Sequence, residues 1–325
     1  MKGARMRHWA GPVAGLAVLG LLVWRFGADA FVDGVRRLDA GTVAVAVAVG
    51  VVTTVAAAWR WTVVAHGIGL RVPLRSAVAA YYRSQLVNLT VPGGVVGDVE
   101  RAVRHGRGSG ALGASVRSVG WERFGGQAVQ LGLTAAVLLA VPSAFRGLAG
   151  WVAIGLLSVV VIAAAVCAAV TWLGRRALGG RLAGALRVAV SDLRVGLLSR
   201  HTWPRVLVAS AVVVAGHAIV IVIAMRATGV EVGLGSIVPL ALVVLAGSAV
   251  PANVAGWGPR EGVAAWAFAA TGLGASAGVT AAAAYGALVL LAALPGAVVL
   301  LVQLLRGRQA ATDFERRPEQ VLADA

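Results

Sequence analysis

Long apolar runs, separated by short polar and basic stretches, dominate the pattern along this chain of 325 residues. A helix of about 20 apolar residues crosses the hydrocarbon core of a bilayer. Six runs reach that length, at 9–26, 42–65, 114–141, 150–173, 204–226 and 276–305. The pattern therefore predicts an all-α polytopic membrane protein with six full spans.

Two further apolar pieces, 74–91 and 236–250, are too short or too polar to cross a bilayer alone. Each ends at a related motif, VPGGVVGDVERA in the first case and VPANVAGWGPREG in the second. Short apolar arms broken by Pro and Gly suit re-entrant hairpins, whose backbone must be covered by protein or line a water-filled cavity. We expect two re-entrant helical hairpins, at 74–105 and 236–272.

The motifs and the spans around them recur at an offset of about 160 residues, which indicates an inverted repeat of the kind found in many transporters. We expect a first transmembrane half at 1–141, a second half at 142–305 and a cytoplasmic tail at 306–325. Chance similarity is the alternative, because a pattern of Val, Pro and Gly is common in a chain with 43 Gly.

The basic residues predict the orientation, since cytoplasmic loops of membrane proteins are enriched in Lys and Arg. With the N-terminus inside, the loops outside hold only Arg25, Arg36, Arg37, Arg146 and Arg226. We therefore expect a plasma-membrane protein with both termini in the cytoplasm. The first span has a basic start, an apolar run and ADA at 28–30, so it is either an anchor helix or a cleaved signal peptide.

Composition excludes several classes of function. Only 13% of the residues are charged, against about a quarter in soluble domains, so the chain cannot cover a water-facing surface. Its net charge of +16 is spread between apolar runs rather than gathered on one face, and we expect no nucleic acid partner. One Cys and five scattered His give no disulfide framework and no metal site, and we expect no cofactor.

Charged residues follow each glycine-rich motif at a depth where they are costly, and such residues usually face a cavity or one another. Asp98 has the position of a helix N-cap, and Pro259 has that of a first helical residue. Helix N-termini attract anions, and a guanidinium grips a phosphate bidentately. We therefore expect Arg101 and Arg260 to bind the phosphate of a lipid headgroup.

The carboxylates leave alternatives open. Asp98 and Glu261 either meet a cationic headgroup, carry a coupling proton or pair internally. Adjacent residues on a helix do not face each other, which disfavours pairing of Glu261 with Arg260 and of Glu122 with Arg123. Pairing between the two hairpins stays open.

Other polar residues in the apolar runs have plainer explanations. Arg60, between Trp59 and Trp61, is expected to anchor the end of its span at the membrane interface. Arg117 is expected to extend to the interface in a similar way. His217, midway along its span, is either a proton-coupling group or a neutral histidine bonded across helices.

The segment 181–200 has an apolar face of five residues: Leu182, Leu186, Val190, Leu193 and Leu197. Arg187, Ser191 and Arg194 lie on another face, which is typical of a helix in the cytoplasmic interface that meets anionic headgroups. A plain connector stabilised by packing explains the same pattern.

These motifs resemble the lysylphosphatidylglycerol synthase transmembrane region, the flippase-like domain of the multiple peptide resistance factor. The resemblance spans residues 10–305 and rests on YYRSQLVNLTVPGGVVGDVERAVRHGR, ERFGG at 122–126, VPANVAGWGPREGV and LPGAV at 294–298. The second motif departs from the family pattern in having Pro259. Motifs and resemblance together give these candidate substrate-binding residues: Pro92, Gly93, Gly94, Gly97, Asp98, Arg101, Glu122, Arg123, Asn253, Gly258, Arg260 and Glu261.

The resemblance implies movement of an aminoacylated phospholipid between leaflets. It leaves other lipids open, including polyprenyl-linked sugars. Since the chain ends at Ala325, we expect a stand-alone member without the soluble synthase domain of the full-length factors.

We expect a lipid flippase-like protein and not an enzyme, because no catalytic constellation is visible in the sequence. Two alternatives from other classes stay open. One is a membrane enzyme acting on lipid phosphates, and the other is a scaffold or accessory subunit for a lipid-linked glycosyltransferase. The expected partners are a membrane phospholipid or a polyprenyl-linked lipid, with a second copy of the chain or a glycosyltransferase as possible protein partners.

The topology can be tested with single cysteines at Ser109 and Gly235 in a Cys167→Ala background. Cysteine at Gly235 should react with an impermeant thiol reagent in intact cells, because its hairpin opens outward, and cysteine at Ser109 should not. Labelling of both positions from the same side would contradict the inverted repeat.

Overall fold

The computed structural model describes residues 24, 28–91, 94–147, 150, 181–248, 257–303 and 305. Within these residues the chain is helical and contains no strand. The predicted spans at 9–26 and 150–173 lie almost entirely outside the described residues, as do the tail at 306–325 and three motif residues, Pro92, Gly93 and Asn253.

Three of the described helices are long and apolar enough to cross a membrane. They are α3 (Ala40–Gly67), α9 (Trp203–Ala227) and the helix Ala275–Gln303, whose first part is α12 (Ala275–Ala293). Their bounds match predicted spans at 42–65, 204–226 and 276–305. The all-helical membrane class is therefore confirmed, and the number of full spans stays a prediction.

A fourth long helix, α6 (Leu112–Ala140), matches the predicted span at 114–141 in extent. It differs from the other three in carrying Arg117, Glu122 and Arg123 in its first half. Charged groups at this position need partners if the helix lies in a membrane, and the structure supplies such partners.

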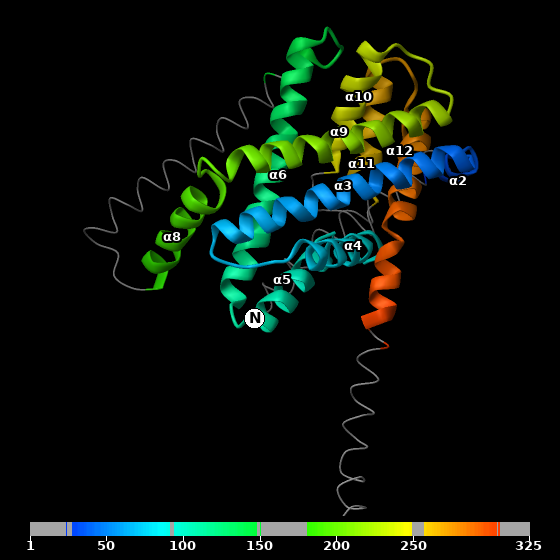
Figure 1. Ribbon diagram of the computed structural model, residues 1–325. Helices are drawn as coiled ribbons and strands as arrows, with labels where there is room; N and C mark the ends of the chain where they lie inside the picture. Colours follow the sequence, from blue (N-terminus) through cyan, green and yellow to red (C-terminus); the bar gives the residue numbers. More distant parts are fainter. Residues whose placement is uncertain are drawn as a thin grey trace, which may run out of the picture.

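Two pairs of short helices connect the long ones. The first pair is α4 (Leu74–Thr90) with α5 (Val96–Ser109), and the second is α10 (Leu234–Gly247) with α11 (Pro259–Ala270). Figure 1 shows α4 and α5 beneath α3, and α10 and α11 close to α9 and α12. The order long, short, short, long thus occurs twice. The helix pairs fall where hairpins were predicted, and their re-entrant character stays a prediction.

The first long helix of each set ends in the same turn. Gly69 follows α3 with φ 87°, and Gly229 follows α9 with φ 91°. The next amides, of Leu70 and Val230, donate to a carbonyl five residues earlier at 2.9 and 3.0 Å. Both turns are Schellman caps, in which a glycine adopts the left-handed conformation at least cost. The shared turn supports a structural repeat.

Helices α3 and α9 run antiparallel and pack side by side (Figure 1). Arg60 Nη1 donates to Ser210 Oγ at 3.1 Å, and Thr53 contacts Gly216. Residues later in α3 therefore lie beside residues earlier in α9. A Cβ at Gly216 would collide with the Thr53 side chain. The two helices therefore come close enough for polar groups on one to bind groups on the other.

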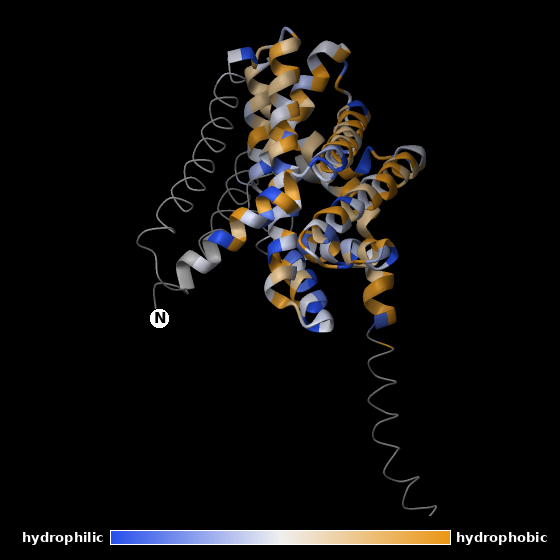
Figure 2. Cartoon of the chain, turned by 60° about the vertical axis from the view of Figure 1, so that its left-hand side comes forward, coloured by the Kyte–Doolittle hydropathy of each residue, from blue (hydrophilic) through white to orange (hydrophobic). Residues whose placement is uncertain are grey.

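Apolar residues fill the interior and also cover much of the outside. The largest buried cluster includes Ile221, Met225, Ile237, Phe268 and Leu288. Figure 2 shows long hydrophobic stretches along the helices, and many exposed side chains are large and apolar. Exposed apolar surface on this scale is typical of contact with lipid. A short helix before α3, α2 (Asp29–Arg36), packs against α12.

The segment predicted as an interfacial helix forms α8 (Arg181–Ser191) and a π-helical turn at Asp192–Leu197. Val190 is buried and Arg187 is exposed, in agreement with an amphipathic arrangement. Its position relative to a membrane stays a prediction.

Arg117 has a partner that the sequence analysis did not anticipate, and its extension to the interface stays a prediction. Its Nε lies 2.5 Å from Asp192 Oδ2, and Asp192 is buried. The guanidinium therefore ties α6 to the π-helical turn.

Replacing the two turn glycines should destabilise the protein. We expect Gly69→Ala and Gly229→Ala each to lower the free energy of unfolding by about 1–2 kcal/mol, since an L-residue with positive φ is strained. Gly233→Ala is the matched control, because Gly233 has φ −62° and, like Gly69, open space where the Cβ would lie. Unfolding by a denaturing detergent measures all three, and equal effects would contradict the shared cap.

Candidate functional site

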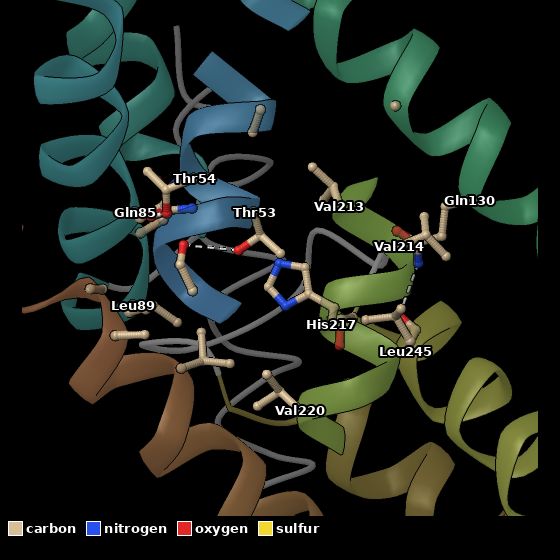
Figure 3. A pocket seen from close by; sticks show the side chains of 18 of the residues that line it. Thr53, Thr54, Gln85, Leu89, Gln130, Val213, Val214, His217, Val220 and Leu245 are labelled. Atoms are coloured by element: carbon tan, nitrogen blue, oxygen red, sulfur yellow. Dashed lines mark hydrogen bonds between the residues drawn. The ribbon is translucent and has the colours of Figure 1, made fainter. Parts of the chain in front are cut away.

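A cavity of about 270 Å³ lies where the two sets of helices meet. Its wall takes residues from α3, α4 and α6 of the first set and from α9, α10, α11 and α12 of the second. Figure 3 shows Thr53 and His217 pointing toward the middle, with Gln85 on one side and Gln130 on the other. The cavity is therefore a joint product of both halves.

A buried carboxylate, that of Glu122, holds the first set of helices together. Its Oε1 accepts hydrogen bonds from Arg60 Nε at 2.8 Å and Nη2 at 2.5 Å, and from the Tyr81 hydroxyl at 2.7 Å. Its Oε2 accepts from Arg101 Nη2 at 3.2 Å. Glu122 is 0% exposed, so its charge is stabilised by these partners and not by water.

A second carboxylate, that of Asp98, is bound just as fully. Its Oδ1 accepts from Ser84 Oγ and from Arg101 Nη2, both at 3.0 Å. Its Oδ2 accepts from Asn88 Nδ2 at 3.0 Å and from Arg123 Nη2. Arg101 therefore bridges the two buried carboxylates, and Arg123 is oriented by the second of them.

The prediction that Asp98 caps α5 was wrong. The helix begins at Val96, and Asp98 lies within its first turn with its side chain directed at neighbouring helices. The amide of Gly97 instead donates to Asn88 Oδ1 at 2.8 Å. A Cβ at Gly97 would collide with the Ser84 backbone, so glycine permits the close contact of α4 with α5 on which this network depends.

The Arg101 guanidinium is enclosed between two aromatic rings. Its Cζ lies 4.1 Å from the centroid of Tyr81 and 4.5 Å from that of Trp61, distances at which cation–π attraction is favourable. The side chain is 1% exposed and does not line the cavity. Arg101 thus stabilises the wall from behind.

The second motif builds a simpler unit at the start of α11. Pro259 is the first helical residue, as predicted. Glu261 Oε2 accepts from the amide of Gly258 at 2.7 Å, which gives a partner to one of the amides that a helix start leaves without one. Gly258 has φ 122°, a conformation that side chains other than glycine rarely adopt.

The expectation that neighbours would not pair was wrong for Arg260 and Glu261. Arg260 donates to Glu261 Oε1 through Nε at 2.9 Å and Nη2 at 2.5 Å. Adjacent side chains within a helix point in different directions and do not normally meet. At the helix start Glu261 turns back toward the N-cap, and the long Arg260 side chain can reach it.

His217 is bonded across helices, which is one of its two predicted roles. Its Nδ1 lies 2.9 Å from the Tyr285 hydroxyl, and both residues line the cavity. The Arg260 Cζ lies 5.0 Å from the Tyr285 ring centroid and 5.6 Å from that of Trp257. Arg260 therefore reaches the same part of the cavity as His217.

The positive and negative side chains of the site lie at different depths from the cavity. Arg60, Arg123 and Arg260 line the cavity, and no carboxylate is among the described residues that line it. The three carboxylates lie behind these arginines, each at most 5% exposed. The cavity therefore presents positive charge to a guest, although most of that charge is neutralised deeper in the protein.

All of this geometry lies within a match to a known family. The model of the lysylphosphatidylglycerol synthase TM region matches residues 9–310. The chain belongs to this family. The resemblance carried by the motifs is thereby confirmed, and the protein is a membrane protein of a lipid-related family. No curated protein and no solved structure matches the chain.

The motif residues on which the family resemblance rests occupy different layers of the site. Gly94, Arg123 and Arg260 line the cavity. The buried residues Asp98, Arg101, Glu122 and Glu261 hold the lining arginines or one another from behind. Gly97 and Gly258 lie at the starts of α5 and α11. Within the described residues, no ion pair joins the two hairpins.

Arg60 was assigned the wrong role, and it is central to the site. It is 7% exposed, binds Glu122 and lines the cavity, so it does not anchor the span at an interface. The flanking tryptophans suggested an interface, but Trp61 is itself buried and donates to Ser118 Oγ at 3.1 Å. The depth of Arg60 in an apolar run was the signal that could have identified it.

Removing the charge of Glu122 should destabilise the protein strongly. We expect Glu122→Gln to lower the free energy of unfolding by about 3–5 kcal/mol, because Arg60 and Arg101 would lose their shared counter-charge in a buried position. Denaturing-detergent titration measures the change, with the exposed Glu231→Gln as the matched control.

A double variant separates charge pairing from packing. Arg60→Gln together with Glu122→Gln should cost less than the sum of the two single changes, because the partners are in contact. Additive costs would contradict the assignment of Glu122 as the counter-charge of Arg60.

Proposed function

We propose that the cavity binds the phosphate of a lipid headgroup and that the protein moves this lipid between the leaflets of the plasma membrane. The observation that carries the proposal concerns the part of the chain that the structure describes: three guanidiniums and no carboxylate line one cavity of a membrane protein. A phosphate stranded in hydrocarbon is very unfavourable. Guanidinium groups replace its water with charge-assisted hydrogen bonds.

The arginines come from both halves of the protein. Arg60 and Arg123 belong to α3 and α6, and Arg260 belongs to α11. Arg260 uses Nε and Nη2 for Glu261, and within the described residues no hydrogen bond uses its Nη1. The Arg123 side chain is 46% exposed, so it too can reach a guest. A phosphate bound here would connect the two halves.

The starts of two short helices border the same cavity. Pro259 and Arg260, the first residues of α11, line it, and so does Gly94, two residues before α5. Helix N-termini carry a partial positive charge that favours anions, and here the amides of Gly258 and Gly97 are already bound by Glu261 and Asn88. The placement of the helix starts supports the same choice of guest as the arginines do.

The size of the cavity decides which part of a lipid enters it. Ligand pockets for drug-sized molecules hold about 300–1,000 Å³, and this cavity holds about 270 Å³. A headgroup fits that volume, whereas two acyl chains do not. We propose that the chains stay in the surrounding lipid, against the exposed apolar faces of the helices.

The repeated order of helices supports a mechanism for movement. In transporters built from two inverted halves, rocking of one half against the other opens a central site first to one side and then to the other. The two hairpins of this protein, with both termini in the cytoplasm, would supply such halves. Headgroup movement would then need no passage through hydrocarbon.

Reconstitution tests the proposal. Purified protein in vesicles should accelerate the exchange of a fluorescent phospholipid, measured as loss of fluorescence to a quencher added only outside. Arg260→Gln should reduce the rate at least about ten-fold, because an amide lacks the charge and the planar fork that bind phosphate. Arg75→Gln, at an exposed position of α4, is the matched control and should keep the wild-type rate.

Two outcomes would overturn the proposal. One is a wild-type rate for Arg260→Gln. The other is a folded wild-type protein that gives protein-free rates with aminoacylated, ordinary and polyprenyl-linked lipids, which would favour a scaffold for a glycosyltransferase.

A further inference from the structure

The carboxylates around the cavity already accept hydrogen bonds from protein groups. Each of the six carboxylate oxygens of Asp98, Glu122 and Glu261 accepts at least one hydrogen bond from the protein. These side chains are almost completely buried and lie behind the arginines. Among the residues that the structure describes, an ammonium group in the cavity would therefore find no accessible carboxylate oxygen.

The aromatic rings are occupied as well. Aromatic faces are the other common binding surface for ammonium groups. The two tyrosines that line the cavity, Tyr81 and Tyr285, already have guanidiniums over their rings at 4.1 and 5.0 Å, those of Arg101 and Arg260. A second cation at either ring would be repelled by the first.

The rest of the wall is formed by apolar side chains and by uncharged polar ones. Hydroxyl and amide side chains line it beside the arginines: Thr53, Thr54, Gln85, Asn88, Gln127, Gln130 and Ser248. Such groups donate and accept hydrogen bonds and so match the hydroxyls of a polyol or a sugar. They give no advantage to a charged substituent.

Two of the amides face the cavity with opposite polarity. Gln85 Oε1 accepts from the Thr54 hydroxyl at 3.1 Å, which leaves both N–H groups of its NH₂ as donors for a guest. Gln130 Nε2 donates one hydrogen to the Leu245 carbonyl at 3.1 Å, which leaves its Oε1 as an acceptor for a guest. Figure 3 shows these two side chains on different sides of the cavity. A hydroxyl-bearing headgroup can therefore meet a donor at one wall and an acceptor at the other.

We infer that the cavity selects an anionic phosphate headgroup whose remaining groups are uncharged hydroxyls, such as glycerol or a sugar, and rejects headgroups that carry an ammonium. The inference rests on the proposed function, because it concerns the same site. The arginines bind the phosphate, and Gln85 and Gln130 bind the hydroxyls. An aminoacylated phospholipid, which the family resemblance implied, brings an ammonium among three guanidiniums and is disfavoured.

Binding to the purified protein in detergent tests this selection. The probes are dioctanoyl forms of phosphatidylglycerol, lysylphosphatidylglycerol, phosphatidylethanolamine and phosphatidic acid, with a short polyprenyl phosphate hexose. Phosphatidylglycerol or the hexose lipid should bind at least about ten-fold more tightly than either ammonium lipid, because an unpaired buried charge is costly. Whichever of phosphatidylglycerol and the hexose lipid binds more tightly shows whether the hydroxyls belong to glycerol or to a sugar. Phosphatidic acid should bind with an affinity between that of this lipid and that of the ammonium lipids.

Two amide variants test the assignment of residues. Gln85→Leu and Gln130→Leu should each weaken phosphatidylglycerol, or the hexose lipid if that binds more tightly, by about three- to ten-fold, the value of a lost hydrogen bond. Their affinity for phosphatidic acid should not change, which also shows that the variants are folded. Gln303→Leu, an amide outside the cavity, is the matched control.

The outcomes separate this inference from the proposed function. Equal or tighter binding of lysylphosphatidylglycerol overturns the inference, and the proposed function stands if translocation still requires Arg260. Hydroxyl-selective binding without any translocation upholds the inference and overturns the proposed function. A parallel loss of phosphatidic acid affinity in both amide variants overturns the assignment of the hydroxyls to Gln85 and Gln130.

Discussion

The burial of Glu122 is the constraint on which the first half of the structure depends. A carboxylate with no exposed surface is tolerated only where cations and hydrogen-bond donors surround it. Here the partners come from three other helices: Arg60 from α3, Tyr81 from α4 and Arg101 from α5. Satisfying one charge therefore requires four helices to meet at one point. Arg101 extends the same requirement to Asp98, and through it to Arg123.

This requirement also explains why the cavity is positive. Each carboxylate draws guanidiniums toward the interior, and the long arginine side chains fill the space between it and the cavity. The anionic ends lie deep, and arginines form the wall. The second half reaches the same result with a single pair, Arg260 and Glu261. The two sets of helices thus share helix order and end turns but differ in how they bury charge.

A membrane protein of this kind separates two surfaces by polarity. Its outer helix faces expose apolar side chains that suit acyl chains, while the inner cavity collects arginines, amides and hydroxyls that suit a headgroup. The proposed movement of a lipid between leaflets would need such a division, because the headgroup and the acyl chains require different surroundings. The polar interior is costly to bury, and residues of this kind in membrane proteins usually serve function.

The sequence by itself determined the helical membrane class, the positions of long and short helices, and the family. These features depend on run length, glycine and proline placement and local motifs, which involve residues close together in the chain. Tertiary structure alone decided the partners of the charges. Arg60 was expected at an interface, yet it binds Glu122, 62 residues away. Local patterns show that a buried charge needs a partner, but only the packing of distant helices decides which residue that partner is.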